Sequence, residues 1–248
     1  MTSFVWGRDP QEAYQNPYEY EAQDQFYREA NNLLQLLFDH LTKKSGTYTR
    51  DEQSAEKAIW MLFLDSLESL RDCLSLLQDK KHRIAGRLFR DAVEAMDIAS
   101  YFCSNDTKKD KHLRDWYNDK VIQNRVYRDY IKENDEGEWE KLKKYYSQLS
   151  KINHRTYRSL AYSYSLGSNG RLIYEGSYDN RFMVPPHVIA MYYALIGDLI
   201  SHFVIRMINS RLISAEEAKV FWSEALEEEV IERRFVSTNR STLKEKRN

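Results

Sequence analysis

Residues 81–103, KHRIAGRLFRDAVEAMDIASYFC, carry a clear helical pattern. Apolar residues recur every three or four positions, which is the spacing of one face of an α-helix. Several of these residues are alanines, and small side chains on such a face allow neighbouring helices to approach closely. We therefore expect this helix to lie at the centre of a helical bundle.

The same periodicity recurs along most of the chain. It predicts further helices over residues 19–44, 51–78, 110–132, 138–160, 185–211 and 214–234, although in 110–132 the apolar positions wander around the helix. The last of these helices opens with Ser214-Ala-Glu-Glu217, the capping-box pattern. Asn169-Gly170 lies between two short apolar segments, which predicts a β-hairpin or a long loop near residues 162–182. The predicted fold is all-α, a bundle of about seven helices with this insertion.

The helical pattern occupies one continuous region, which we interpret as a single domain over residues 19–235. Residues 1–18 contain Pro10 and Pro17 without apolar periodicity, so we expect an extended N-terminal arm. Residues 236–248 are polar and charged and form the predicted C-terminal tail. No recognisable repeat of about 20 to 50 residues occurs, so a solenoid is not predicted.

Composition narrows the class of protein. The chain has 248 residues, of which 42% are hydrophobic, enough for one large core. Only 8 glycines and 4 prolines are present, and because sheet-rich folds need many turns, this favours long helices. The 37 basic and 38 acidic residues give a net charge of -1. This balance gives no support for nucleic-acid binding by the molecule as a whole, although local basic stripes remain possible.

Three features concern location. Cys73 and Cys103 fall on apolar helical patterns, so we expect two buried free thiols in a reducing cytosol. The N-terminal residues lack the basic start and apolar core of a signal peptide. The longest apolar segment, 188–208, is interrupted by three ionisable residues, which favours a buried helix over a membrane span. The expected location is the cytoplasm, with no membrane partner.

A stripe of polar residues runs along the helix predicted for residues 81–103, opposite its apolar face. It contains Arg83, Arg87, Arg90, Glu94, Asp97 and Tyr101. The order from basic to acidic opposes the helix macrodipole, which hints at a role other than stability. The simpler interpretation, which we favour, is a solvated face with two pairs four residues apart, Arg87 with Asp91 and Arg90 with Glu94.

Histidines supply two more candidate sites. In the helix over 138–160, Asn153 lies within the apolar face and His154 on its flank, where a histidine can carry a proton or simply donate to a carbonyl. In the helix over 185–211, one line contains Asp198, His202 and Arg206. An aspartate that orients a histidine suits acid–base chemistry, but we favour a line of residues facing solvent.

Several motifs of metal and cofactor sites are missing from the sequence. Neither Glu-x-x-His nor His-Glu-x-x-His occurs, so a carboxylate-bridged di-iron bundle or a zincin helix has no support. The glycine-rich loops that bind nucleotide phosphates, Gly-x-x-x-x-Gly-Lys and Gly-x-Gly-x-x-Gly, do not occur either. No metal and no cofactor is predicted.

Two segments, KHRIAGRLFRDAVEA at 81–95 and YYSQLSKINH at 145–154, resemble the paired helices of a broad group of uncharacterised bacterial proteins related to the HEPN superfamily. This resemblance implies a bundle of four or more helices and frequent dimerisation. In some members it also implies a metal-independent ribonuclease with an Arg-x4–6-His motif, often within toxin–antitoxin or phage-defence systems.

The chain departs from that motif. No arginine lies five to seven residues before His154, and the one match in spacing, Arg181 to His187, contains Pro185-Pro186. If a ribonuclease is present, the resemblance implies that His154 is the general base or acid toward a ribose 2′-hydroxyl. The other catalytic candidates are Arg90 and Arg158, which would stabilise phosphate charge, and Glu94, which would orient an arginine. The binding candidates are Arg83, Arg87, Asn153 and Tyr157.

Three functions follow from these observations. The leading prediction is a HEPN-like module that acts through self-association, as a dimer, or by binding a protein or RNA partner, in bacterial defence or stress response. The alternative is a ribonuclease, which requires Arg90, Glu94 and His154 to converge in one pocket. The third is a small-molecule sensor with an apolar cavity between helices.

Overall fold

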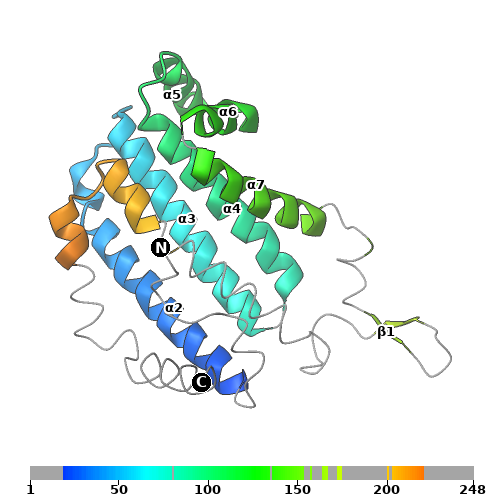
Figure 1. Cartoon of the computed structure of the whole chain (residues 1–248). Helices are drawn as coiled ribbons and strands as arrows, with labels where there is room; N and C mark the ends of the chain where they lie inside the picture. Colours follow the sequence, from blue (N-terminus) through cyan, green and yellow to red (C-terminus); the bar gives the residue numbers. More distant parts are fainter. Residues whose placement is uncertain are drawn as a thin grey trace, which may run out of the picture.

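Helices α3 (Ala55–Gln78) and α4 (His82–Phe102) form an antiparallel pair at the centre of the molecule (Figure 1). The computed structural model describes residues 19–79, 81–134, 136–153, 157, 164–166, 172–174, 200 and 203–220. Two hydrogen bonds join the pair, from Ser66 Oγ to the carbonyl of Ala92 (2.9 Å) and from Cys73 Sγ to that of Ala85 (3.1 Å). Side chains reach across to the opposite backbone because alanines face α3. The central helix predicted for 81–103 is confirmed, and the fold is all-α.

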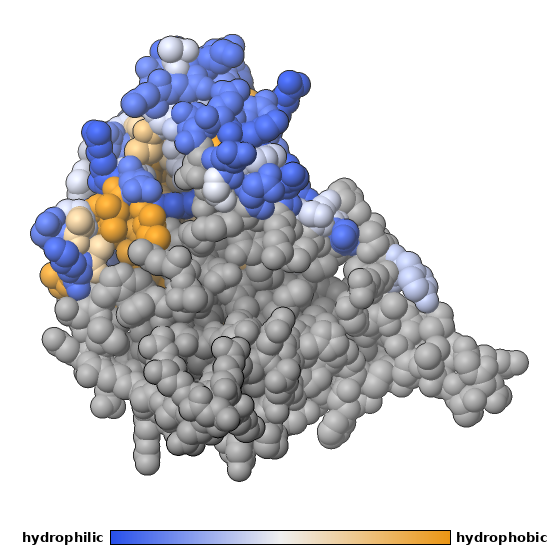
Figure 2. All heavy atoms as spheres, viewed as in Figure 1, coloured by the Kyte–Doolittle hydropathy of each residue, from blue (hydrophilic) through white to orange (hydrophobic). Residues whose placement is uncertain are grey.

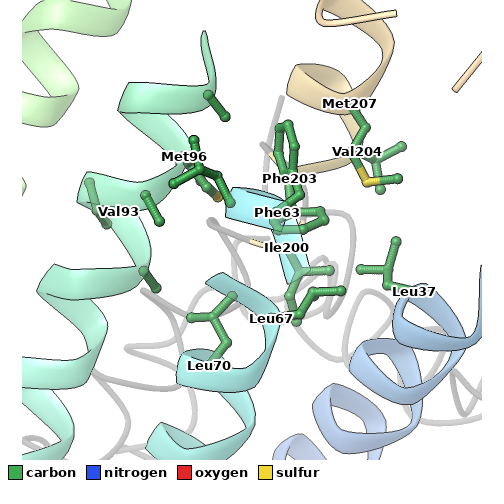
Figure 3. Packing of buried hydrophobic residues seen from close by; sticks show 14 of the residues in the cluster. Leu37, Phe63, Leu67, Leu70, Val93, Met96, Ile200, Phe203, Val204 and Met207 are labelled. Atoms are coloured by element: carbon green, nitrogen blue, oxygen red, sulfur yellow. The ribbon is translucent and has the colours of Figure 1, made fainter. Parts of the chain in front are cut away.

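The core lies between α2 (Glu19–Thr42), α3, α4 and the helical segment 203–209 (Figure 3). Leu37 of α2 and Met96 of α4 are buried on opposite sides of Phe63. Phe203 packs edge-on against Phe63, with ring centroids 4.8 Å apart. The apolar faces predicted for the first three helices therefore meet in one core, which a chain segment from much later in the sequence completes.

Helix α3 begins at a well-defined cap. The Oγ of Ser54 accepts a hydrogen bond from the backbone N–H of Lys57 at 3.2 Å, which satisfies one of the free donors of the first turn. The Lys57 ammonium in turn donates to the carbonyls of Thr49, Arg50 and Glu52. These bonds fix the segment that joins the short 3-10 helix η1 (Ser45–Thr47) to α3.

The single helix predicted over 110–132 is wrong, because the chain forms two helices, α5 (Lys109–Tyr117) and α6 (Asn124–Asn134). Asp119 adopts a left-handed conformation, with φ of 57°. The N–H of Lys120 bonds the carbonyl of Asp115 at 2.9 Å, as in a helix that ends through a left-handed residue. The two short helices cover one end of the bundle (Figure 1). The change of direction explains why the apolar positions fit no single helical face.

Helix α7 (Glu136–Asn153) follows and packs against α4 and α6. Strands β1 (Tyr164–Leu166) and β2 (Leu172–Tyr174) then form an antiparallel pair, so the predicted hairpin is present. Leu166 lies opposite Leu172. A two-residue turn at Asn169-Gly170 would instead have placed Leu166 opposite Ile173, so the register differs from that of a two-residue hairpin. The turn itself lies outside the described residues.

The last described segment, 203–220, contains two helical stretches, 203–209 and 215–220. The predicted capping box opens the second, because Glu217 N–H donates to Ser214 Oγ (3.1 Å) and Ser214 N–H donates to Glu217 Oε2 (2.6 Å). The Lys44 ammonium donates to the carbonyl of Leu212, which ties this turn to the end of α2. The predicted arm, 1–18, and tail, 236–248, lie outside the described residues.

The cysteines and the apolar character of the helices were also predicted from the sequence. Cys73 is buried as expected, whereas Cys103 is only half-buried, and both thiols are free. No helix in the described part of the chain combines the length and apolar character needed to cross a bilayer.

Candidate functional site

The polar stripe of α4 is buried at its C-terminal end. Asp97 and Tyr101 are both 0% exposed, so the solvated face that we favoured is wrong for these two residues. The Tyr146 hydroxyl of α7 donates to Asp97 Oδ2 at 2.8 Å, and the Tyr101 hydroxyl lies 2.6 Å from His112 Nδ1 of α5. The later helices therefore cover the face that the isolated helical pattern assigned to water.

The same burial corrects the line predicted along the helix over 185–211. Arg206 is only 9% exposed, and its Nη1 donates to Asp97 Oδ1 at 2.7 Å. The interpretation as a line facing solvent is therefore wrong at Arg206. Asp198 and His202 lie outside the described residues. Asp97 thus links α4 to α7 through Tyr146 and to the segment 203–209 through an ion pair.

One turn before Asp97, the carboxylate of Glu94 accepts hydrogen bonds from residues of two helices, α4 and α6. Glu94 Oε1 accepts from Arg90 Nε at 2.8 Å, from Asn124 Nδ2 at 3.3 Å and from Arg128 Nη2 at 3.4 Å. The pair predicted within the helix, Arg90 with Glu94, is confirmed. We call these four residues, Arg90, Glu94, Asn124 and Arg128, the arginine site.

The Arg128 guanidinium is held by stacking as well as by charge. It lies over the ring of Tyr146, with Cζ 3.7 Å from the ring centroid, which is a close cation–π contact. Its Nε is buried and has no hydrogen-bond partner among the described residues. Burial and the neighbouring Asp97 charge raise the pKa of Tyr146 well above its usual range. The Tyr146 phenol therefore stays neutral, and its hydroxyl remains a hydrogen-bond donor to Asp97.

The arginine site is partly open to solvent, unlike Asp97. The side chains of Arg90, Glu94 and Arg128 are 24%, 22% and 26% exposed. Figure 2 shows hydrophilic residues gathered over α5, α6 and the adjoining part of α7. Partial desolvation of the neighbouring Asp91 carboxyl raises its pKa, and the Glu94 charge adds to this. Two guanidinium groups that are fixed in place but still reachable can bind an anion.

The structure brings together some of the predicted site residues. Arg90 and Glu94 are in contact, whereas Arg87 is exposed one turn away and its predicted pair with Asp91 is not formed. Arg83 lies in α4 and Asn153 at the end of α7, Tyr157 is 79% exposed, and His154 and Arg158 lie outside the described residues. Convergence with His154 therefore stays a prediction.

Three residues of the arginine site and of the contacts of Asp97 were not predicted from the sequence: Asn124, Arg128 and Tyr146. Arg206 was predicted, in the line with Asp198 and His202. Tyr146 lies at the apolar spacing of the helix predicted over 138–160, and its hydroxyl gives no sign of a buried acceptor. No signal pointed to Arg128, because the helix predicted over 110–132 had no defined apolar face from which to place its polar residues. In the described part of the chain, no group of three or more His, Cys, Asp or Glu residues is arranged to hold a metal ion.

Comparison with protein-family models, with curated proteins and with solved structures gave no match.

Proposed function

We propose that the chain is a HEPN-like association module that binds single-stranded RNA through the arginine site. The observation that carries this proposal is the convergence of Arg90 and Arg128 on one oxygen of Glu94 while both guanidinium groups remain about a quarter exposed. Guanidinium groups bind phosphate oxygens through charge-assisted hydrogen bonds, and fixed ones lose little freedom when they do so.

Charge supports a polyanionic partner at this place. The arginine site holds two arginines and one glutamate, a local excess of one positive charge, on a chain whose net charge is -1. The adjacent exposed Arg87 and Asp91 leave this excess unchanged. Because only two arginines can reach phosphate, we expect weak binding with a modest salt dependence, a slope of about -1.4 in log K against log salt for a single strand.

The test is fluorescence anisotropy with a short labelled single-stranded RNA at several salt concentrations. Arg90→Ala and Arg128→Ala should each weaken binding and reduce the salt slope by about one counterion. Arg125→Ala is the matched control, because Arg125 lies on α6 but is exposed and pairs with Asp129 instead. Equal losses in all three variants would show nonspecific attraction and contradict a site at Glu94.

Sedimentation of the same samples separates RNA binding from self-association. A protein that forms a dimer but shows no RNA binding at low salt would assign the module to self-association and remove RNA as its partner. A dimer that binds RNA is compatible with the proposal, since frequent dimerisation is implied by the HEPN resemblance. Gel filtration at the concentrations of the binding assay provides the control.

The second candidate is a metal-independent ribonuclease with His154, Arg90 and Arg158. It is favoured by the direct packing of α7 on α4, where Tyr146 bonds Asp97 at 2.8 Å, because α7 ends one residue before His154. Purified protein should then cleave RNA in the presence of a chelator, and His154→Ala should abolish cleavage while leaving RNA affinity unchanged. Cleavage that persists in His154→Ala would contradict this role.

A further inference from the structure

We propose that Glu94 occupies, in the free protein, the position that a phosphate group of the ligand takes in the arginine site. The inference rests on the proposed function for the source of that phosphate, the RNA backbone. It adds that the site is closed by an internal competitor, so binding is an exchange of one anion for another.

The hydrogen bonds of Glu94 have the pattern expected for a bound anion. A single oxygen, Oε1, takes donors from Arg90 on its own helix and from Asn124 and Arg128 on α6. Carboxylate and phosphate oxygens compete for the same guanidinium N–H groups. The Arg128 guanidinium also lies over the ring of Tyr146, with Cζ 3.7 Å from the centroid, so this arginine is positioned by more than Glu94.

Glu94 can leave this position more easily than its neighbour Asp97. Asp97 is fully buried and bonded to Arg206, whereas Glu94 is 22% exposed and its closest ion pair lies within one helix. Partly exposed pairs of this kind contribute little to stability, whereas breaking a buried pair is costly. When Glu94 turns toward solvent, the Tyr146 ring still supports Arg128, so both arginines remain available to the incoming phosphate.

The exchange predicts an unusual sign for a mutation. Glu94→Gln keeps an oxygen acceptor for the arginines but removes the competing charge, so RNA affinity should rise by about tenfold, the equivalent of one partly screened charge interaction. A glutamate that only orients the arginines for binding would give the opposite result, a loss of affinity. The direction of the change therefore distinguishes the two roles.

The experiment measures labelled single-stranded RNA binding by anisotropy for wild type, Glu94→Gln, Asp91→Asn and Arg90→Ala, with inorganic phosphate as competitor. Asp91→Asn is the charge-matched control, since it removes an exposed carboxylate three residues away on the same helix. We expect the gain in Glu94→Gln to exceed that in Asp91→Asn several-fold, and phosphate to compete better against RNA bound to Glu94→Gln. Thermal unfolding followed by circular dichroism verifies that each variant is folded.

The outcomes separate the inference from the proposed function. Binding that Arg90→Ala abolishes, but that Glu94→Gln weakens or raises no more than Asp91→Asn, would overturn the exchange and leave the RNA site standing. Failure of wild type and Glu94→Gln alike to bind at low salt would overturn both. Binding by Glu94→Gln alone would support both, since it would reveal a site that Glu94 closes in the wild type.

Discussion

Replacing Asp97 by alanine should destabilise the fold more than any other single change in the polar stripe of α4. Asp97 is 0% exposed and Arg206 is 9% exposed, so the variant leaves a buried guanidinium without this carboxylate at 2.7 Å. It also removes the acceptor of the Tyr146 hydroxyl. Breaking a buried ion pair from one side costs about 3 to 5 kcal/mol, and the orphaned phenol adds about 1 kcal/mol.

Variants that remove only part of these contacts should lose less free energy of unfolding. Tyr146→Phe removes one hydrogen bond and should cost about 1 kcal/mol. Asp97→Asn keeps the shape but loses the charge, so its loss should lie between those of Tyr146→Phe and Asp97→Ala. The triple variant Asp97→Leu, Tyr146→Phe, Arg206→Met removes together the three side chains that these two described bonds join. It should be more stable than Asp97→Ala, because apolar replacement of both members of a buried ion pair costs less than removal of one member.

Urea unfolding followed by the fluorescence of the 5 tryptophans measures these free energies. Asp91→Ala, an exposed carboxylate on the same helix, is the control and should change stability by no more than about 0.5 kcal/mol. If Asp97→Ala does not fold at all, Asp97→Asn still ranks the cluster against the control. A loss below about 1 kcal/mol for Asp97→Ala, at an unchanged urea dependence, would refute the buried ion pair.

Three further predictions concern other parts of the fold. Burial raises the pKa of Tyr146 above its ordinary 10.0, so above pH about 10 only the unfolded chain loses this proton. The free energy of unfolding should therefore be constant with respect to this group up to that pH and decrease above it. The decrease should be less steep in Tyr146→Phe, and urea titrations at several pH values measure it. Ser54→Ala should cost about 1 kcal/mol and Ser54→Gly only a few tenths, measured by thermal unfolding, because Ser54 caps α3. Asp119→Val should cost about 1 to 2 kcal/mol while Asp119→Gly is neutral or stabilising, measured in the same way, because the φ of Asp119 is 57°; similar losses for both would contradict the left-handed conformation.

The helices that the sequence predicted well are those whose signal is local. α3 and α4 have apolar residues at helical spacing throughout, and their observed ends differ from the predicted ones by a few residues at most. The region 110–132 failed because its break depends on Asp119 in a left-handed conformation, without the glycine that usually marks such an end. Wandering apolar positions were the available sign of two short helices with different faces.

The same distinction applies to the arginine site. Arg90 with Glu94 was predictable, because residues four apart on a helix are neighbours. The other contact with an arginine joins residues far apart in the sequence, because Arg128 lies 34 residues from Glu94. The same holds for the contacts of the neighbouring Asp97, which lies 49 residues from Tyr146 and 109 residues from Arg206. Periodicity shows which face of a helix is polar, but it does not show which later helix will cover that face.

The charge order along α4 illustrates how this limits inference from a single helix. Acidic residues near a helix C-terminus oppose the macrodipole, which hinted at a functional role, although a solvated face was the favoured interpretation of the sequence. For Asp97 the structure supplies another explanation, since Arg206 and Tyr146 provide the compensating donors and the residue serves packing. Glu94 has compensating arginines too, but these remain partly exposed. A functional interpretation of the polar stripe therefore applies to its solvent-accessible half, Arg87 to Glu94, where an incoming anion can reach the guanidinium groups.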